Sequence, residues 1–132
     1  MKANAFVAVS LGLLMAGAAN ANEPGYGQVA FSVVEGKSAQ EVFKPDTPEI
    51  VLHVQLVDVT AGETLGATWV AEKTAAAPPN YKIDSIEAPA TDTDEFSFSL
   101  SKPDSGWPAG EYRVDLTIHG KFAKSAHFTV TQ

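Results

Sequence analysis

Apolar and polar residues alternate along most of the chain, which predicts β-strands with one buried face. In residues 50–56 the even positions are apolar, while His53 and Gln55 point to the opposite face. Residues 65–71 place their odd positions on the inner face, with Trp69 at the centre. The same two-residue period occurs in residues 29–33, 96–100, 112–118 and 126–130, and more weakly in 81–86. After residue 21, no segment of the sequence keeps the 3.6-residue period of an amphipathic helix.

Turn-forming residues separate these runs at short intervals. They are concentrated in residues 44–48, 61–63, 77–80 and 103–106. About seven short strands with clean alternation, connected by such turns, pack as two antiparallel sheets around one core. The pattern therefore predicts an all-β, two-sheet antiparallel sandwich of about seven strands.

The last two predicted strands form a hairpin whose register follows from parity. Ile118 and Phe128 are both even-numbered inward residues, so directly opposed residues have an even index sum and the loop has an odd number of residues. A three-residue loop, residues 119–121, satisfies this condition, and its central glycine supplies the positive φ of a bulged turn. We therefore predict that Ile118 pairs with Phe122. Lys124 then faces inward, unless the pattern breaks there or its side chain snorkels to the surface.

Trp69 in the third predicted strand and residues 106–114, with the sequence GWPAGEYRV, are characteristic of a known architecture. With these features the chain resembles a bacterial immunoglobulin-like, or fibronectin-III-like, β-sandwich domain over nearly all of residues 22–132. The resemblance implies an immunoglobulin-like sandwich in which Tyr112 ties a corner through a hydrogen bond to the backbone. It implies no particular activity. Domains of this kind serve as adhesive modules, spacers, chaperones, inhibitors and subunits of envelope complexes.

The first 21 residues have the pattern of a secretory signal peptide. Lys2 forms a positive n-region, residues 5–16 are almost wholly apolar, and Ala19 and Ala21 are the small residues that a signal peptidase reads. The apolar run is shorter than the ~20 residues of a membrane-spanning helix, which argues against the alternative of an uncleaved anchor. We predict cleavage after Ala21, with residues 16–18 as a second possible site. A single domain, residues 22–132, then reaches the periplasm, or the medium as the alternative, without a membrane anchor.

Charge and the absence of cysteine narrow the classes of function. Loss of Lys2 leaves eight basic residues against sixteen acidic ones, a net charge of −8. So acidic a domain is repelled by phosphate backbones, which excludes nucleic acid as the expected partner. With no cysteine in the sequence, the chain has neither disulfides nor the lipid-modified cysteine of a lipoprotein, and packing alone stabilises it.

The sequence contains three histidines, but their spacing does not predict a metal site. His53 and His127 lie on the outward faces of strands that belong to opposite sheets, and His119 lies at a hairpin turn. None of these pairs has the spacing of a zinc or copper site. The acidic run of residues 92–95 is a weak candidate for calcium, because it lacks the glycine and the distal bidentate acid of an EF-hand loop. We expect no metal and no cofactor.

Catalytic motifs are equally absent from the sequence. It has no Gly-x-Ser-x-Gly elbow and no glycine-rich phosphate loop. Ser97 and Ser99 alternate with phenylalanines and are expected to face water rather than act as nucleophiles. We therefore expect that the protein is not an enzyme.

Four residues are candidates for contact with a partner. Trp107, between a glycine and a proline, either anchors a partner or caps the open end of the core, and capping is the favoured interpretation. Pro78 and Pro79 lie in an apolar, turn-rich loop, and His119 lies at the hairpin tip.

Together these patterns predict a non-enzymatic, exported protein-interaction module that acts through loops or an edge strand. Its expected partner is another envelope or secreted protein. One alternative is an inhibitor or immunity-type protein whose acidic surface blocks a basic exported enzyme, and a focused acidic patch at one loop end would favour it. The other alternative is a periplasmic protein that binds a small ligand or a metal.

Overall fold

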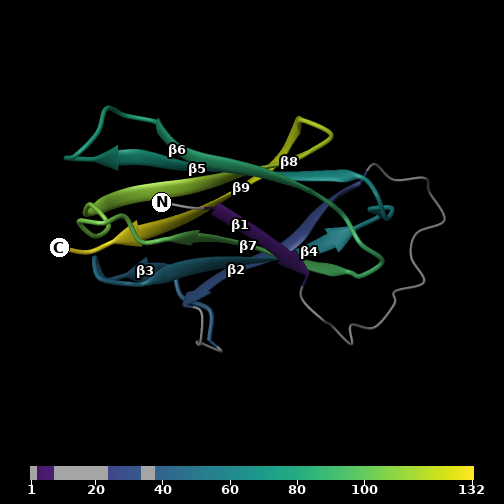
Figure 1. The fold of residues 1–132 in the computed structure, drawn as a ribbon, viewed down its shortest axis with the longest axis horizontal. Coiled ribbons are helices and arrows are strands. Elements are labelled where there is room, and N and C mark those ends of the chain that lie inside the picture. The colour runs from purple at the N-terminus through teal and green to yellow at the C-terminus, as the bar shows by residue number, and fades with distance from the viewer. Residues whose placement is uncertain (1–2, 8–23, 34–37) are drawn as a thin grey trace.

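The computed structural model describes residues 3–7, 24–33 and 38–132 (Figure 1). The predicted cleavage sites at residues 16–21 lie outside these residues. The part of the chain that the structure describes contains no helix long and apolar enough to cross a membrane. Its strands are β1 (Ala3–Val7), β2 (Gly25–Val33), β3 (Val42–Phe43), β4 (Glu49–Val57), β5 (Thr64–Thr74), β6 (Tyr81–Pro89), β7 (Glu95–Ser101), β8 (Gly110–Ile118) and β9 (Lys121–Val130).

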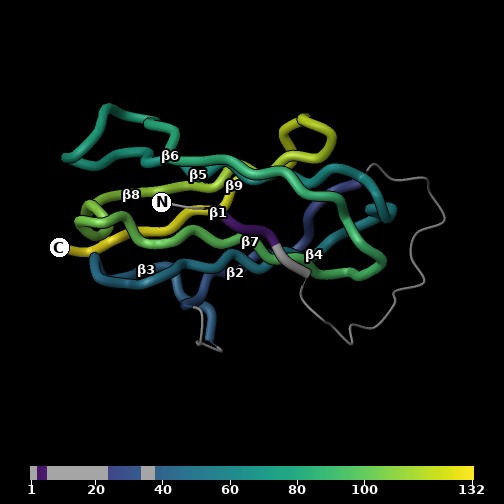
Figure 2. The backbone as a smooth tube through the Cα atoms, in the orientation of Figure 1, coloured from purple at the N-terminus to yellow at the C-terminus, as the bar shows by residue number. Residues whose placement is uncertain are grey.

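Two sheets form the fold, as the alternation predicted. One has the order β1-β7-β4-β2 and the other the order β3-β9-β8-β5-β6. All described strand pairs are antiparallel except β3 and β9, which run parallel over two residues. Figure 2 shows the long strands of the two layers running in similar directions, with the connecting loops gathered at the two ends. The predicted all-β sandwich is therefore confirmed.

The predicted inner faces meet in one core. The inward residues of β4, β5, β7, β8 and β9 are all buried, and Trp69 is fully buried at the centre, as predicted. Five aromatic rings surround Phe128 of β9, at centroid distances between 4.9 and 6.1 Å. These rings belong to Phe31, Phe43, Trp69, Trp107 and Tyr112. Phe128 thus links the two sheets and the loop that contains Trp107.

A hydrogen bond from Tyr112 holds the corner before β8, as the resemblance implied. The hydroxyl of Tyr112 donates a hydrogen bond to the carbonyl of Pro108, four residues earlier. Burial raises the pKa of Tyr112 to about 12. Gly110 adopts a φ of 145°, and a Cβ there would lie 2.2 Å from the carbonyl oxygen of Lys73 on the neighbouring β5. Only glycine allows the two backbones to approach so closely.

The β8–β9 hairpin differs from the predicted one. Ile118 pairs with Lys121, so the loop contains only His119 and Gly120. Both loop residues have positive φ, 55° and 77°, as in a two-residue type I′ turn. The register shifts after Leu116, and this β-bulge restores the predicted parity for the rest of the hairpin. The predicted pairing of Ile118 with Phe122 was therefore wrong.

Two further side chains show where local alternation fails. Lys124 snorkels, because its Nζ reaches the carbonyl oxygen of Gly27 on β2 at 2.8 Å. Ser97 and Ser99, expected to face water, are 0% and 1% exposed. Ser97 is bonded through its Oγ to Nδ1 of His53 at 2.9 Å, and both serines lie between β4 and β1. The prediction for these two serines was wrong, because neighbouring strands cover them on both sides.

The N-terminal strand β1 was not part of the predicted domain. It pairs antiparallel with β7 over all five of its residues, from Ala3 opposite Leu100 to Val7 opposite Phe96. The backbone N–H of Ala3 donates to Oδ2 of Asp84 on β6 at 3.0 Å. The purple strand in Figure 1 therefore lies at the side of the sandwich where an edge of each sheet comes close.

Candidate interaction surfaces

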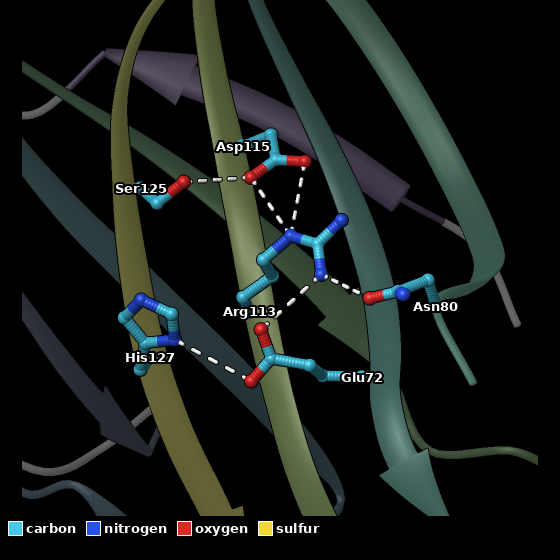
Figure 3. Close-up of polar contacts among 6 residues, drawn as sticks. All are labelled: Glu72, Asn80, Arg113, Asp115, Ser125 and His127. Atoms are coloured by element: carbon cyan, nitrogen blue, oxygen red, sulfur yellow. Dashed lines mark hydrogen bonds and ion pairs between the residues drawn. The ribbon is translucent and has the colours of Figure 1, made fainter.

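A network of charged and polar side chains covers part of the outer face of the five-stranded sheet (Figure 3). At its centre, Nε of Arg113 on β8 lies 3.1 and 3.2 Å from the two carboxylate oxygens of Asp115. Nη1 of Arg113 donates to Glu72 of β5 at 3.2 Å and to Asn80 of the β5–β6 loop at 2.6 Å. Asp115 also accepts a hydrogen bond from Ser125 of β9 at 2.7 Å. Residues of β5, β8 and the β5–β6 loop thus hold the guanidinium group, and Ser125 of β9 holds Asp115 in place.

The carboxylates of this network stabilise the charged form of Arg113. Burial lowers the pKa of Arg113, but hydrogen bonds and charge from Asp115 and Glu72 outweigh that effect, so the pKa is raised. His127 lies at the rim, with Nδ1 3.8 Å from Glu72 and 61% of its side chain exposed. Partly exposed ion pairs of this kind each contribute about 0–1 kcal/mol to stability. The network therefore fixes a charged sheet face, and Nε and Nη1 of Arg113 are already bound within the domain.

Two hollows on the described surface are open to solvent. The larger, about 560 Å³, lies between the end of β2, the short strand β3 and the loop at residues 44–48. The smaller, about 280 Å³, lies on the outer face of the five-stranded sheet around Gly66 and Thr117. Neither is an enclosed cavity of the kind that buries most of a small ligand.

Acidic side chains gather at one loop end of the sandwich. The β4–β5 and β6–β7 loops are tied together there, because Gly62 N–H donates to Ala90 and Ala90 N–H donates to Glu63, at 2.8 and 2.7 Å. We call this region the acidic loop end. Its carboxylates belong to Asp58, Glu63, Asp92, Asp94 and Glu95, of which Asp58 and Asp92 are exposed. The hairpin tip adjoins it, since His119 Nε2 lies 3.8 Å from Glu63.

Strand β7 forms a third candidate surface. Its inner neighbour is β4, and the register of this pair runs without a shift from Glu49 opposite Ser101 to Gln55 opposite Glu95. Its outer neighbour is β1, which belongs to the predicted signal peptide. With β1 in place, the five central residues of β7 are all buried. Removal of β1 would turn β7 into an edge strand.

Trp107, the first of the predicted contact residues, is a core residue. It is 2% exposed and packs edge-on against Tyr112 at a centroid distance of 5.8 Å. Its indole Nε1 donates to the carbonyl oxygen of Thr47 at 2.8 Å. Trp107 therefore caps the core, as favoured, and its buried indole offers no face to a partner.

The other predicted contact residues are exposed but are not brought together. Pro78 and Pro79 lie in the β5–β6 loop, next to Gly110 at the start of β8. His119 follows the end of β8, and its N–H donates to Thr64 at 2.8 Å. The nine residues of β8 separate these two places, a distance of roughly 30 Å. These residues therefore belong to opposite ends of the domain, and one compact partner site does not include both.

His53 illustrates how the histidines are placed. Its ring lies between Ser32 and Ser97, with Nε2 3.0 Å from one hydroxyl and Nδ1 2.9 Å from the other. Both nitrogens are therefore engaged in the fold. Among the described residues, no group of three His, Cys, Asp or Glu side chains could hold a metal ion, and this includes the acidic run at 92–95.

The sequence analysis did not single out the network around Arg113. Part of it was readable, because Arg113 and Asp115 are two residues apart on the polar side of a predicted strand. Glu72 and Ser125 come from neighbouring strands, so their contribution depends on registers that parity alone does not give. The edge of β7 was equally hidden, since no local pattern pairs residues 3–7 with residues 96–100.

Comparison with known proteins shows the fold and no family. No family model matches the chain, and no curated protein matches it significantly. An immunoglobulin-like protein from Pseudomonas aeruginosa superposes with a TM-score of 0.56 at 12% identity, covering 83% of this chain and 98% of that one. Part of an alkylpurine DNA glycosylase from Pseudomonas fluorescens superposes with a TM-score of 0.55 at 13% identity, covering 83% of this chain and 31% of the glycosylase.

The architecture is thus an immunoglobulin-like β-sandwich, as the resemblance implied. In constant-type immunoglobulin domains one sheet has the strand order A-B-E-D. Here β2, β4 and β7 take the places of A, B and E, and β1 lies where strand D would lie. Without β1, the first sheet ends at β7.

Proposed function

We propose that this chain is an exported, non-enzymatic protein-interaction module that acts through an edge strand, with the loops as a secondary surface. The proposed compartment is the periplasm, reached after cleavage at Ala21, and the proposed partner is another envelope or secreted protein. The immunoglobulin-like fold is compatible with such a role and does not by itself imply an activity.

The observation that carries the proposal is the contrast between β7, which becomes an edge once residues 1–21 and with them β1 are removed, and the other sheet edges. Proteins protect exposed edges by short strands, charges, prolines or bulges. Among the described strands, β3 is two residues long, β2 has an irregular register against β4, and β6 has a register shift against β5 and bears several charged residues and a proline. Residues 96–100 of β7 contain no charge, no proline and no shift against β4. An edge left without protection in this way favours a partner strand.

The test is capture of the partner in its native envelope. The full chain with a C-terminal tag is exported, crosslinked and purified, and co-purifying proteins are identified by mass spectrometry. Ser99→Pro removes an N–H that points away from β4 and so blocks the edge without disturbing the ladder inside the sheet. Ser85→Pro on the edge strand β6 is the matched control, since the Ser85 N–H is bonded to the side chain of its neighbour Asp84, at 2.8 Å.

We expect one stoichiometric partner with the native chain and with Ser85→Pro, and loss of that partner with Ser99→Pro. Circular dichroism and thermal unfolding of both variants check that each is folded. If nothing is captured with the native chain, the interaction module itself is refuted. If the partner persists with folded Ser99→Pro, the partner uses a surface other than β7.

A second candidate function is inhibition of a basic exported enzyme. The acidic loop end favours it, because four carboxylates lie on two loops that are joined by backbone hydrogen bonds, and a fifth, Glu95, begins β7 beside them. Such a focused field attracts a basic surface and accelerates association. The charge-neutral variant with Asp58→Asn and Asp92→Asn tests it, since both side chains are exposed. If an exported hydrolase is captured and inhibited by the native protein, this variant should associate more slowly at low salt.

A further inference from the structure

The backbone groups and the inward-facing side of the β7 edge determine which kind of strand can pair with it. We infer that its occupant in the exported protein is an uncharged, extended segment of another exported polypeptide, with alanine-sized side chains at alternate positions. This inference rests on the proposed function and adds to it the chemical class of the partner. The template is β1, a strand of this chain that already pairs with the edge.

The first amide of β1 establishes which backbone groups pair. The N–H of Ala3 donates to Oδ2 of Asp84 on β6 at 3.0 Å, so it points away from β7. Amide directions alternate along a strand, and the N–H groups of Asn4 and Phe6 therefore point toward β7.

Their partners in register are Ser99 and Ser97. These two residues form hydrogen-bonded pairs with β1, so their N–H and C=O groups lose their ladder partners when β1 is cleaved away. An edge with such unpaired groups is a template for another strand. An added strand that follows β1 must therefore donate two N–H groups, two residues apart, to Ser97 and Ser99.

The inner side of the edge selects small side chains. Ala3 and Ala5 are half-buried, lie opposite Leu100 and Phe98, and pack against the core. They occupy the narrow side of the sandwich, where β1 also contacts Asp84 of β6. A charge at either position would lie against the buried apolar side chains of Leu100 and Phe98, which is costly.

These features disfavour a second copy of this chain as the occupant. In an antiparallel β7–β7 pair that bonds through Ser97 and Ser99, the residues between and beside them are phenylalanine and leucine. Such bulky side chains would take the inward positions that alanine takes in β1, and overpacking of this kind is destabilising.

The experiment uses the full chain exported by a bacterium and purified from the envelope, with its N-terminus read by mass spectrometry. The probe is a synthetic peptide of residues 2–8. A first variant of the peptide carries N-methyl groups on Asn4 and Phe6, which block the amides that point toward β7. The matched control carries them on Ala5 and Val7, whose amides point away. A third peptide carries Ala5→Asp.

We expect cleavage after Ala21 and saturable binding of the native peptide, with slower hydrogen exchange at the amides of Ser97 and Ser99. The Ala5/Val7-methylated peptide should bind similarly, whereas methylation at Asn4 and Phe6 should weaken binding about thirtyfold, by the loss of two hydrogen bonds. The Ala5→Asp peptide should also bind more weakly than the native peptide. Protein with Ser99→Pro should not bind the native peptide.

Several results would overturn the inference. Retention of residues 1–21 would mean that the chain fills its own edge. Absence of binding at peptide concentrations up to about 1 mM, an affinity weaker than about −4 kcal/mol, would refute a strand acceptor. So would equal binding of the two methylated peptides. A dimer with protected Ser97 and Ser99 amides in the absence of peptide would identify a second copy instead. Because partner capture in the envelope is measured separately, loss of peptide binding with capture intact overturns this inference alone.

Discussion

Replacement of each tryptophan by phenylalanine separates the contribution of a hydrogen bond from that of burial. Trp69 and Trp107 are 0% and 2% exposed. Both have an aromatic neighbour at 6.1 Å, namely Phe128. They differ in the indole nitrogen, because Nε1 of Trp107 donates to Thr47, whereas that of Trp69 has no hydrogen-bond partner among the described residues.

The expected magnitudes follow from this difference. Each Trp→Phe change removes a similar part of a buried ring, at a cost of roughly 1–2 kcal/mol. Trp107→Phe also leaves the carbonyl oxygen of Thr47 without its donor, which adds about 1–2 kcal/mol. We therefore expect a loss of about 1–2 kcal/mol for Trp69→Phe and about 2–4 kcal/mol for Trp107→Phe. Both losses lie below the ~5–15 kcal/mol stability of a small domain, so both variants should fold.

Urea unfolding followed by far-ultraviolet circular dichroism measures both losses without relying on the altered fluorophores. The emission of Trp69→Phe, in which Trp107 is the remaining tryptophan, should be blue-shifted and resistant to acrylamide quenching. If Trp69→Phe proves as destabilising as Trp107→Phe, the hydrogen bond to Thr47 contributes nothing. If the emission of Trp107 is that of an exposed indole, the capping role is refuted.

Three further predictions address the backbone, the tyrosines and the polar network. Gly110→Ala should destabilise the domain by more than about 3 kcal/mol in urea unfolding, because its Cβ would overlap the backbone of β5. Burial raises the pKa of Tyr112 from 10.0 to about 12 and also raises that of Tyr26. Stability from these groups is present below pH 10 and is lost as the pH rises toward 12. In the Tyr81→Phe variant, whose remaining tyrosines are Tyr26 and Tyr112, the phenolate absorbance at 295 nm should therefore rise together with unfolding. Arg113→Met should change stability by less than about 1 kcal/mol.

Each of these predictions has a contrary outcome. Gly110→Ala with native stability would mean that β5 and β8 separate easily at that point. Phenolate absorbance that rises well before the loss of circular dichroism would show that the two tyrosines are accessible in the folded state. A loss of more than about 2 kcal/mol in Arg113→Met would mean that the network stabilises the fold instead of only shaping its surface.

Alternation predicted the core because each strand buries one face whatever its neighbours are. The inward sets of β4, β5 and β8 could therefore be read from the sequence, and so could the corner tyrosine. The hairpin loop could not, since a three-residue loop and a two-residue loop with a bulge have the same parity. Ser97 and Ser99 are buried through His53 and β1, which lie 44 residues or more away in the sequence. Burial of this kind depends on the order of the strands in the sheet, which local periodicity does not reveal.

The carboxylates of the acidic loop end give the domain an uneven electric field along its length. The opposite end carries Lys44, Lys73 and Lys102 among its acidic residues, whereas Lys121 of the hairpin tip is the nearby cation at the end where the β4–β5 and β6–β7 loops meet, so we expect the more negative potential there. A diffusing basic molecule is therefore drawn toward one end of the domain before any side chain makes contact. The Debye length shrinks from about 10 Å at 0.1 M salt to about 3 Å at 1 M. The ionic strength of the surroundings thus determines the distance from the surface at which a basic molecule begins to be drawn toward that end.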